Sequence, residues 1–167
     1  MRATNGRQRP SSGVPYTRIF AAFMLATLIS TLFTLPAQAA VTGITNSGPA
    51  KVLPATGYAY TLVVTNDGTA DTNVIVTDTV AVATGVSASY ILSTAPGVPV
   101  PCTGTGTGID PFVCTAPAMA ASETMTITVN ATSGAAGTTG TNDATVDSDN
   151  SALVSATQQT TPVENAD

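Results

Sequence analysis

Histidine and tryptophan are absent from the chain, arginine is absent from residues 40–167, and these absences exclude more chemistry than any motif supplies. Histidine is the commonest general acid and base near neutral pH, and it completes Ser-His-Asp and Cys-His arrangements. Imidazole metal sites need it as well. A Ser-Lys pair using Lys51, or a pair of carboxylates, stays formally open, but nothing flanking Lys51 resembles a nucleophile motif. We therefore predict no catalytic residues, no cofactor and no enzymatic activity.

Positive charge is almost missing too. Four of the 5 basic residues lie within 1–39, so residues 40–167 keep Lys51 alone against 10 acidic residues, a side-chain charge of −9. Affinity for phosphate backbones comes from Lys and Arg that displace counterions, and attraction to anionic lipid needs the same residues. The sequence predicts no nucleic-acid partner, and no membrane partner once residues 1–39 are removed.

Residues 1–39 have the composition of an export signal, which we expect to be helical. Four arginines precede an apolar run from 19 to 35, and small residues follow at Ala37 and Ala39. This order predicts cleavage between Ala39 and Ala40 and a secreted, cell-surface or periplasmic protein. The apolar run is at the lower edge of what spans a bilayer, so a retained anchor is the alternative.

Period-2 alternation of apolar residues is the main structural signal in the rest of the chain. Gly57–Thr79 holds two alternating strands around a polar turn, which we interpret as a central hairpin. Prolines bracket an edge-like segment near Val52. Further strands are expected at 41–46, 87–92, 123–132, 141–147 and 151–158. The pattern predicts an all-β antiparallel sandwich of about seven or eight strands over residues 40–160, with a flexible C-terminal tail at 161–167.

Two cysteines follow the export signal, Cys102 and Cys114, and they enclose a Gly-rich segment. An even pair in an exported chain predicts a disulfide. A redox or metal role is disfavoured because the spacing is not C-x-x-C and no further ligand is nearby. The predicted core consists mostly of small aliphatic residues, so the domain needs a disulfide or neighbouring molecules to be robust.

A set of residues with a characteristic order and spacing runs through the strands and the cysteine pair: Tyr60, Thr61, Val63, Val64, Asn66, Gly68, Ala70, Val74, Val76, Asp78, Cys102, Cys114, Thr141, Asn142, Ala144 and Val146. In this order they resemble the conserved-repeat domain called domain of unknown function eleven, a module of bacterial and archaeal surface proteins. The resemblance covers about residues 45–160. It implies an immunoglobulin-like sandwich with a surface or matrix role, here in one copy rather than the usual tandem array. The Leu-Pro pair that usually follows Asp78 in the family is replaced by Thr79 and Val80.

Asp143, Asp147 and Asp149 lie close together in the sequence, beside Asn150. Their oxygens are ligands of the kind that calcium prefers. The segment lacks the Gly and the distal Glu of a complete calcium loop, so a solvated turn is our interpretation. We predict no metal site, and these residues are the calcium candidates.

Lys51, Asn142 and Asp78 are similar to the lysine, asparagine and carboxylate with which some bacterial adhesin modules form an intramolecular isopeptide bond. The simpler interpretation is an exposed lysine and a turn-bonding asparagine, because lysine is rarely buried without a partner. Leu53–Gly57 also matches the sortase string L-P-x-T-G. A sorting signal stands at a C-terminus before an apolar stretch, so we treat this match as chance.

Two functions remain compatible with these residues. The first is a structural or adhesive surface protein, a matrix or fibre subunit whose sandwich edges pair with copies of itself or with other surface proteins. The alternative is a soluble binding module for a protein or glycan partner. Carbohydrate sites use exposed aromatic faces, and the aromatic residues outside 1–39 are Tyr58, Tyr60, Tyr90 and Phe112.

Overall fold

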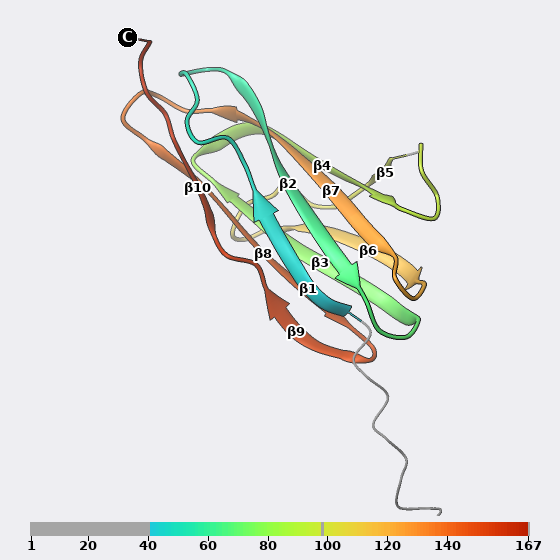
Figure 1. Cartoon of the computed structure of the whole chain (residues 1–167). Coiled ribbons are helices and arrows are strands. Elements are labelled where there is room, and N and C mark those ends of the chain that lie inside the picture. The colour runs from blue at the N-terminus through green and yellow to red at the C-terminus, as the bar shows by residue number, and fades with distance from the viewer. Residues whose placement is uncertain (1–40, 98, 167) are drawn as a thin grey trace, which may run out of the picture. The chain divides into compact units, whose positions relative to one another are not determined.

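The computed structural model describes residues 41–97 and 99–166, and the predicted export signal with its helix lies outside them (Figure 1). The described residues form strands joined by turns, and no helix among them is long and apolar enough to cross a membrane. The all-β prediction is confirmed. The strands are β1 (Val41–Ser47), β2 (Gly57–Asn66), β3 (Asp71–Ala81), β4 (Ala83–Leu92), β5 (Val100–Pro101), β6 (Phe112–Met119), β7 (Thr124–Ser133), β8 (Thr139–Ser148), β9 (Ser151–Ser155) and β10 (Gln159–Pro162).

The strands form two antiparallel sheets that face each other across one core. One sheet has the order β1-β2-β7-β4-β5, and the other has the order β10-β8-β3-β6 with β9 also paired to β8. Figure 1 shows β1, β2 and β7 lying over β8 and β3. The predicted antiparallel sandwich is therefore confirmed.

Alternation explains why these segments become strands. In β2, Tyr60, Leu62 and Val64 are fully buried while the residues between them are partly exposed. Leu62 pairs with Ile127 of β7, whose own alternation buries Met125, Ile127 and Val129. Val and Thr are branched at Cβ, which restricts their rotamers in a helix and suits a pleated surface.

The interpretation of Gly57–Thr79 as a hairpin is wrong, although both strands exist. β2 belongs to one sheet and β3 to the other, so the chain crosses the core between Asn66 and Asp71. Asn66 is fully buried, and its Nδ2 donates to the carbonyls of Thr69 (2.9 Å), Met119 (3.3 Å) and Ala120 (2.9 Å). These bonds hold the connection that carries the chain from one sheet to the other, where the turn-forming residues alone had suggested a hairpin.

The C-terminal boundary also differs from the prediction. β10 runs to Pro162 and pairs with β8, while Thr161 and Val163 are buried. Val163 forms a parallel bridge with Val52, and the Glu164 amide donates to the Val52 carbonyl at 3.0 Å. The domain therefore continues past residue 160, because the last apolar residues complete the sheet and anchor the edge-like segment at Val52.

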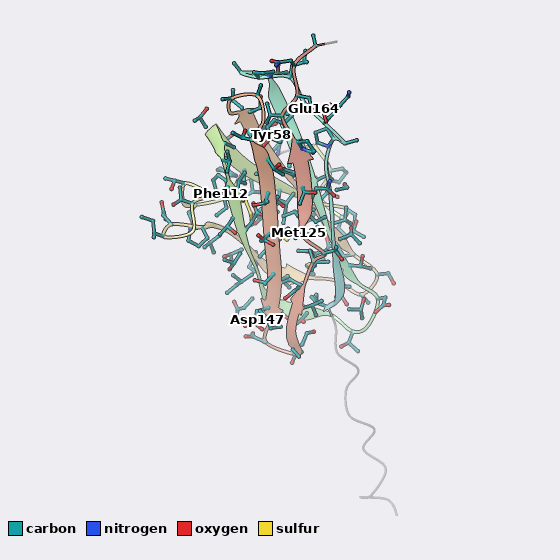
Figure 2. The ribbon with its side chains drawn as sticks, turned by 90° about the vertical axis from the view of Figure 1, so that its left-hand side faces the viewer. Tyr58, Phe112, Met125, Asp147 and Glu164 are labelled. Carbon is teal, nitrogen blue, oxygen red and sulfur yellow. A yellow bond between two sulfur atoms is a disulfide. The ribbon has the colours of Figure 1, made fainter. Side chains whose placement is uncertain are left out.

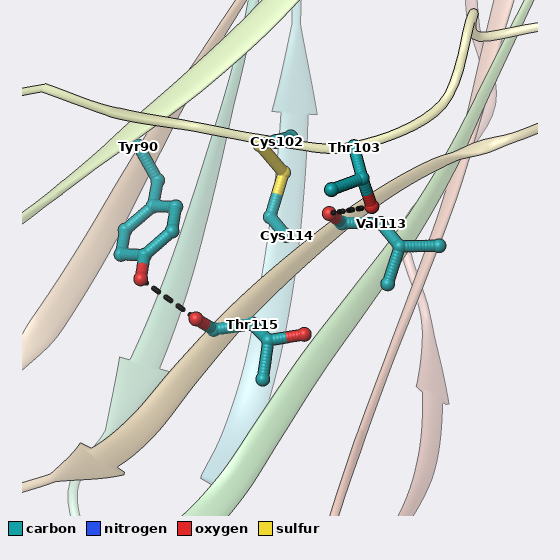
Figure 3. Close-up of a disulfide and its surroundings, with 6 residues drawn as sticks. All are labelled: Tyr90, Cys102, Thr103, Val113, Cys114 and Thr115. Carbon is teal, nitrogen blue, oxygen red and sulfur yellow. Dashed lines mark hydrogen bonds between the residues drawn. A yellow bond between two sulfur atoms is a disulfide. The ribbon is translucent and has the colours of Figure 1, made fainter.

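The disulfide joins Cys102 to Cys114 on β6, with 4.5 Å between the Cα atoms (Figure 3). β6 itself was not expected from the sequence, which suggested only a closed loop there. The enclosed segment is a narrow ribbon in which Thr103 and Val113 exchange two backbone hydrogen bonds. Gly106 lies directly against the Phe112 ring, where a Cβ would stand 2.4 Å from a ring carbon, so no larger residue fits without movement.

We expect the double substitution Cys102→Ser and Cys114→Ser to lower the free energy of unfolding by about 3 kcal/mol, since the bond closes a short loop in the unfolded chain. Urea denaturation of the oxidised protein and of the double variant measures the difference. The wild type under reducing conditions is the control and should match the variant. Equal unfolding midpoints for all three would contradict a stabilising role.

Candidate functional site

A buried polar cluster lies where β1, β3 and β8 meet, and it contains two of the three isopeptide candidates. Asp78 and Asn142 are both fully buried because alternation places them on the core side of β3 and β8. Asn142 Nδ2 donates to Asp78 Oδ1 at 2.8 Å. Asn46 Nδ2 of β1 donates to the Asn142 backbone carbonyl at 2.9 Å. The cluster therefore links three strands of both sheets.

Three oxygens of this cluster have no hydrogen-bond partner among the described residues: Asp78 Oδ2, Asn142 Oδ1 and Asn46 Oδ1. All three are acceptors as long as Asp78 is ionised, so none can satisfy another. The pKa of Asp78 is raised to about 7, because burial and the nearby charge of Asp143 raise it by more than the hydrogen bond from Asn142 lowers it. Protonation turns one of the oxygens into the missing donor.

The chemistry available to this pair is proton uptake. A protonated Asp78 has a hydroxyl to donate to a buried acceptor, and Asn142 Oδ1 is an unpartnered acceptor on the side chain already bonded to it. A carboxylic acid and a carboxamide can form a ring of two hydrogen bonds, which satisfies both side chains at once. An ionised Asp78 leaves a charge in the core with a single donor, which is costly.

Lys51 is not brought to this cluster. Its side chain is 62% exposed and its Nζ lies 3.1 Å from Glu164 Oε2, in an ion pair at the protein surface. Figure 2 labels Glu164 on that surface. Of the three residues proposed for an isopeptide bond, the structure joins Asp78 to Asn142 and gives Lys51 a different partner.

The calcium candidates are also separated. Asp143 and Asp147 are both exposed on β8, four residues apart on one face, a span of about 13 Å in a strand. Gln158 Nε2 donates to both carboxylate oxygens of Asp143, whereas Asp149 Oδ2 accepts hydrogen bonds from Thr72 Oγ1 and Asn73 Nδ2. No group of three or more metal-ligating side chains occurs in the described part of the chain.

Asp71 is a buried carboxylate whose role the sequence did not reveal, since it stands among turn residues. Its oxygens accept hydrogen bonds from Ser148 Oγ (2.6 Å), Asn150 Nδ2 (2.9 Å) and the Thr72 amide (2.7 Å). Burial alone would raise its pKa, but the hydrogen bonds, from Ser148 first, outweigh burial and hold the pKa below its ordinary value. Asp71 thus joins the start of β3 to the turn between β8 and β9.

Glu123 is a second buried carboxylate with a structural role. It accepts hydrogen bonds from the Ala120 amide at 2.7 Å and from the amide and hydroxyl of Thr94. Burial acts to raise its pKa, yet the Thr94 and Ala120 hydrogen bonds lower the pKa overall. The only sequence signal was its place just before a strong strand.

Two of the shallow surface hollows formed by the described residues have linings that do not include Asp78, Asn142 or Asn46. One, of about 350 Å³, is lined by Lys51, Leu53 and Glu164 among others. The other, of about 280 Å³, lies over β3, β8 and the end of β9, between Thr77, Thr145 and their neighbours.

The sequence matches no known family model and no curated protein. Among solved structures, a cohesin module from a Clostridium perfringens family 33 glycoside hydrolase is 10% identical with a TM-score of 0.48, covering 76% of this chain and 99% of that chain. AvmM, which catalyses macrocyclization in alchivemycin A biosynthesis, is 12% identical with a TM-score of 0.47, covering 78% of this chain and 92% of that chain. A Clostridium perfringens family 123 glycoside hydrolase is 9% identical with a TM-score of 0.46, and the match spans 74% of this chain but 27% of that chain. Likenesses this low identify neither a family nor an activity.

The Asp78 pair predicts that stability falls as pH rises between about 4 and 7. In that window the folded protein holds a proton that the unfolded chain has released, so unfolding becomes easier by up to about 4 kcal/mol. Asp78→Asn cannot ionise, and its amide can form two hydrogen bonds with Asn142. Its free energy of unfolding should therefore fall much less over this pH range, and it should be more stable than the wild type at pH 8. Urea denaturation at pH 4.5, 6 and 8 measures the effect.

The matched control for that series is Asp143→Asn, which removes an exposed charge near Asp78. Its free energy of unfolding should still fall with pH almost as much as that of the wild type. An equally steep decline in Asp78→Asn and in the wild type would show that Asp78 does not titrate in this window.

The separation of Lys51 from Asn142 predicts an intact mass without loss of ammonia. The expected mass is that of the purified chain with one disulfide, less residues 1–39 where the predicted cleavage occurs, because the lysine that an isopeptide needs is paired with Glu164. Mass spectrometry under denaturing conditions tests this, with Lys51→Ala as the control. A further deficit of about 17 Da, the mass of ammonia, that disappears in Lys51→Ala would overturn it.

Proposed function

We propose that this protein is an exported, non-catalytic structural or adhesive subunit of a cell surface or extracellular matrix, and a member of the conserved-repeat surface family that it resembles. A disulfide-closed β-sandwich supports this, because disulfides persist in oxidising compartments outside the cytosol. The buried carboxylates also support it, since Asp71 and Glu123 are engaged in holding strands and turns together.

One observation carries the assembly part of the proposal, which is the position of β1. β1 is the outermost strand of its sheet and pairs with β2 on one side. Its core contribution consists of Val41 and Ile44. The predicted cleavage before Ala40 leaves this strand at the very beginning of the chain. A terminal edge strand can leave its own sheet and pair with β2 of another copy at little cost.

The edge at β6 is covered, which directs assembly toward β1. Both backbone groups of Val113 pair with Thr103, and the Thr115 carbonyl accepts a hydrogen bond from the Tyr90 hydroxyl at 2.7 Å (Figure 3). Pro117 has no amide hydrogen to offer. Val113, Thr115 and Pro117 are the alternate residues of β6 whose backbone groups point away from β3. Few unpaired donors and acceptors therefore remain at this edge for another strand.

The three other edge strands are shorter than β1, and β9, which pairs with β8, has five residues. β5 has only two residues, one of them Pro101. At the end of β10 the Pro162 carbonyl accepts a hydrogen bond from the Val52 amide at 3.0 Å, so the chain covers its own edge there. β1, with seven residues and no proline, is the longest edge strand free of these features.

The glycan-binding alternative is weakened by the positions of the aromatic side chains. Tyr60, Tyr90 and Phe112 are buried in the core. Tyr58 is partly buried with its ring packed edge-on against Tyr60, 5.2 Å between centroids. Burial therefore removes three of the four aromatic side chains outside residues 1–39 as stacking surfaces for a sugar.

An engineered disulfide between β1 and β2 tests strand exchange. Thr45 and Val63 are paired neighbours, and paired residues of antiparallel strands have Cα distances that suit a disulfide. In the variant Thr45→Cys with Val63→Cys, oxidised after concentration, exchange predicts disulfide-linked multimers on a non-reducing gel and larger particles by size exclusion and negative-stain microscopy.

Thr61→Cys with Thr128→Cys is the matched control, because these residues pair between two central strands that cannot exchange. It should form its bond within one chain. If both variants stay monomeric at high concentration, β1 does not exchange and this route of assembly is refuted.

A further inference from the structure

The two sheets differ completely in charge. The strands of the β1-β2-β7-β4-β5 sheet contain no Asp, Glu, Lys or Arg. The opposite sheet carries Asp71 and Asp78 on β3 and Asp143 and Asp147 on β8. Residues 40–167 have a side-chain charge of −9, so an uncharged sheet face is an exception on this surface.

The outward face of the uncharged sheet is a regular array of hydroxyl and methyl groups, which we call the hydroxyl face. Strand register aligns its residues in rows, because Thr61 pairs with Thr128 and Thr128 pairs with Ser89. The next row holds two aliphatic side chains, Val63 and Ile91, on either side of Thr126. The hydroxyl face consists of Thr45, Ser47, Thr61, Val63, Thr65, Ser87, Ser89, Ile91, Thr124, Thr126, Thr128 and Asn130, all of which are partly or fully exposed.

The area of the hydroxyl face is sufficient for a specific contact. Four strands spaced by about 4.8 Å and about eight residues long at about 3.3 Å per residue cover roughly 500 Å². Two such faces bury roughly 1,000 Å² together, which is the lower end of the range for specific protein–protein contacts.

We propose that the hydroxyl face docks against the same face of a second copy. This inference rests on the proposed role as an assembling subunit and assigns it a second contact surface, separate from the β1 edge. Contact through the acidic sheet would bring carboxylates of two strongly negative chains together. The hydroxyl face avoids that repulsion and the cost of desolvating charges.

Self-docking also suits the chemistry of the face. Two identical surfaces that meet about a two-fold axis must be complementary to themselves. A threonine or serine hydroxyl both donates and accepts, so it can pair with its own counterpart, which neither a carboxylate nor an ammonium group can do. The methyl groups of threonine, with Val63 and Ile91, supply apolar area between the hydroxyls.

The test compares aspartate substitutions on the two sheets. Thr128→Asp and Ser89→Asp add a charge to the hydroxyl face, and Thr77→Asp and Thr145→Asp add the same charge at partly exposed positions of β3 and β8. The full-length chain is expressed with export, purified as secreted and analysed by sedimentation velocity, with circular dichroism to confirm folding.

We expect the wild type to dimerise more tightly as salt rises, because salt screens the repulsion between the two chains. Thr128→Asp and Ser89→Asp should weaken the dimer about tenfold or more, since the two-fold axis places both new charges in one interface. Thr77→Asp and Thr145→Asp should change it little. A wild type that stays monomeric, or equal weakening by substitutions on both sheets, would overturn the proposal.

Thr45 and Val63 belong to the hydroxyl face, so the Thr45→Cys with Val63→Cys experiment is repeated in a chain that also carries Thr128→Asp. Multimers that persist with the added charge arise from exchange of β1, which keeps the two proposals distinguishable. Multimers in that experiment together with unimpaired dimers in Thr128→Asp would leave the proposed function standing and refute the hydroxyl face. Co-sedimentation with insoluble cellulose or chitin tests whether a glycan occupies the hydroxyl face instead. If Thr128→Asp abolishes that binding and leaves dimerisation unchanged, the face binds a glycan and self-docking is refuted.

Discussion

The crossing between Asn66 and Asp71 is the constraint on which the sandwich depends. It carries the chain from the sheet of β2 to the sheet of β3 in a few residues, and a buried side chain holds each end. Asn66 bonds the carbonyls of Thr69, Met119 and Ala120, while Asp71 collects donors from the turn after β8. A buried polar group without partners is costly, so the hydrogen bonds that both residues make in the crossed arrangement stabilise it.

The buried carboxylates divide according to how many donors surround each. Asp71 and Glu123 have several donors each, so hydrogen bonding overcomes burial and their pKa values are lowered. Asp78 has one donor, Asn142, and its pKa is raised. The first two therefore stabilise the fold once ionised, whereas Asp78 stabilises it while protonated. One core thus contains carboxylates whose contributions to stability change with pH in opposite directions.

The features proposed to act in function lie on the surface and consist of backbone edges and uncharged hydroxyls. The β6 edge is covered by Thr103, Tyr90 and Pro117, while β1 begins the described chain as an edge strand. The remaining broad surface without charge is the hydroxyl face. Copies of a chain with a charge of −9 repel each other least where carboxylates are absent. The acidic composition therefore favours association through the uncharged face.

The sequence by itself determined the all-β class, the location of most strands and the pairing of Cys102 with Cys114, because alternation, β-branched residues and an isolated cysteine pair are local signals. It missed β6, the strand at 159–162 and the crossing after Asn66, whereas its preferred interpretation of Lys51 as an exposed lysine agrees with the structure. Those features depend on which strand each segment meets across the core. Only the tertiary structure decided that Asp78 and Asn142 share a buried site and that charge is confined to one sheet, because strands distant in sequence set those neighbours.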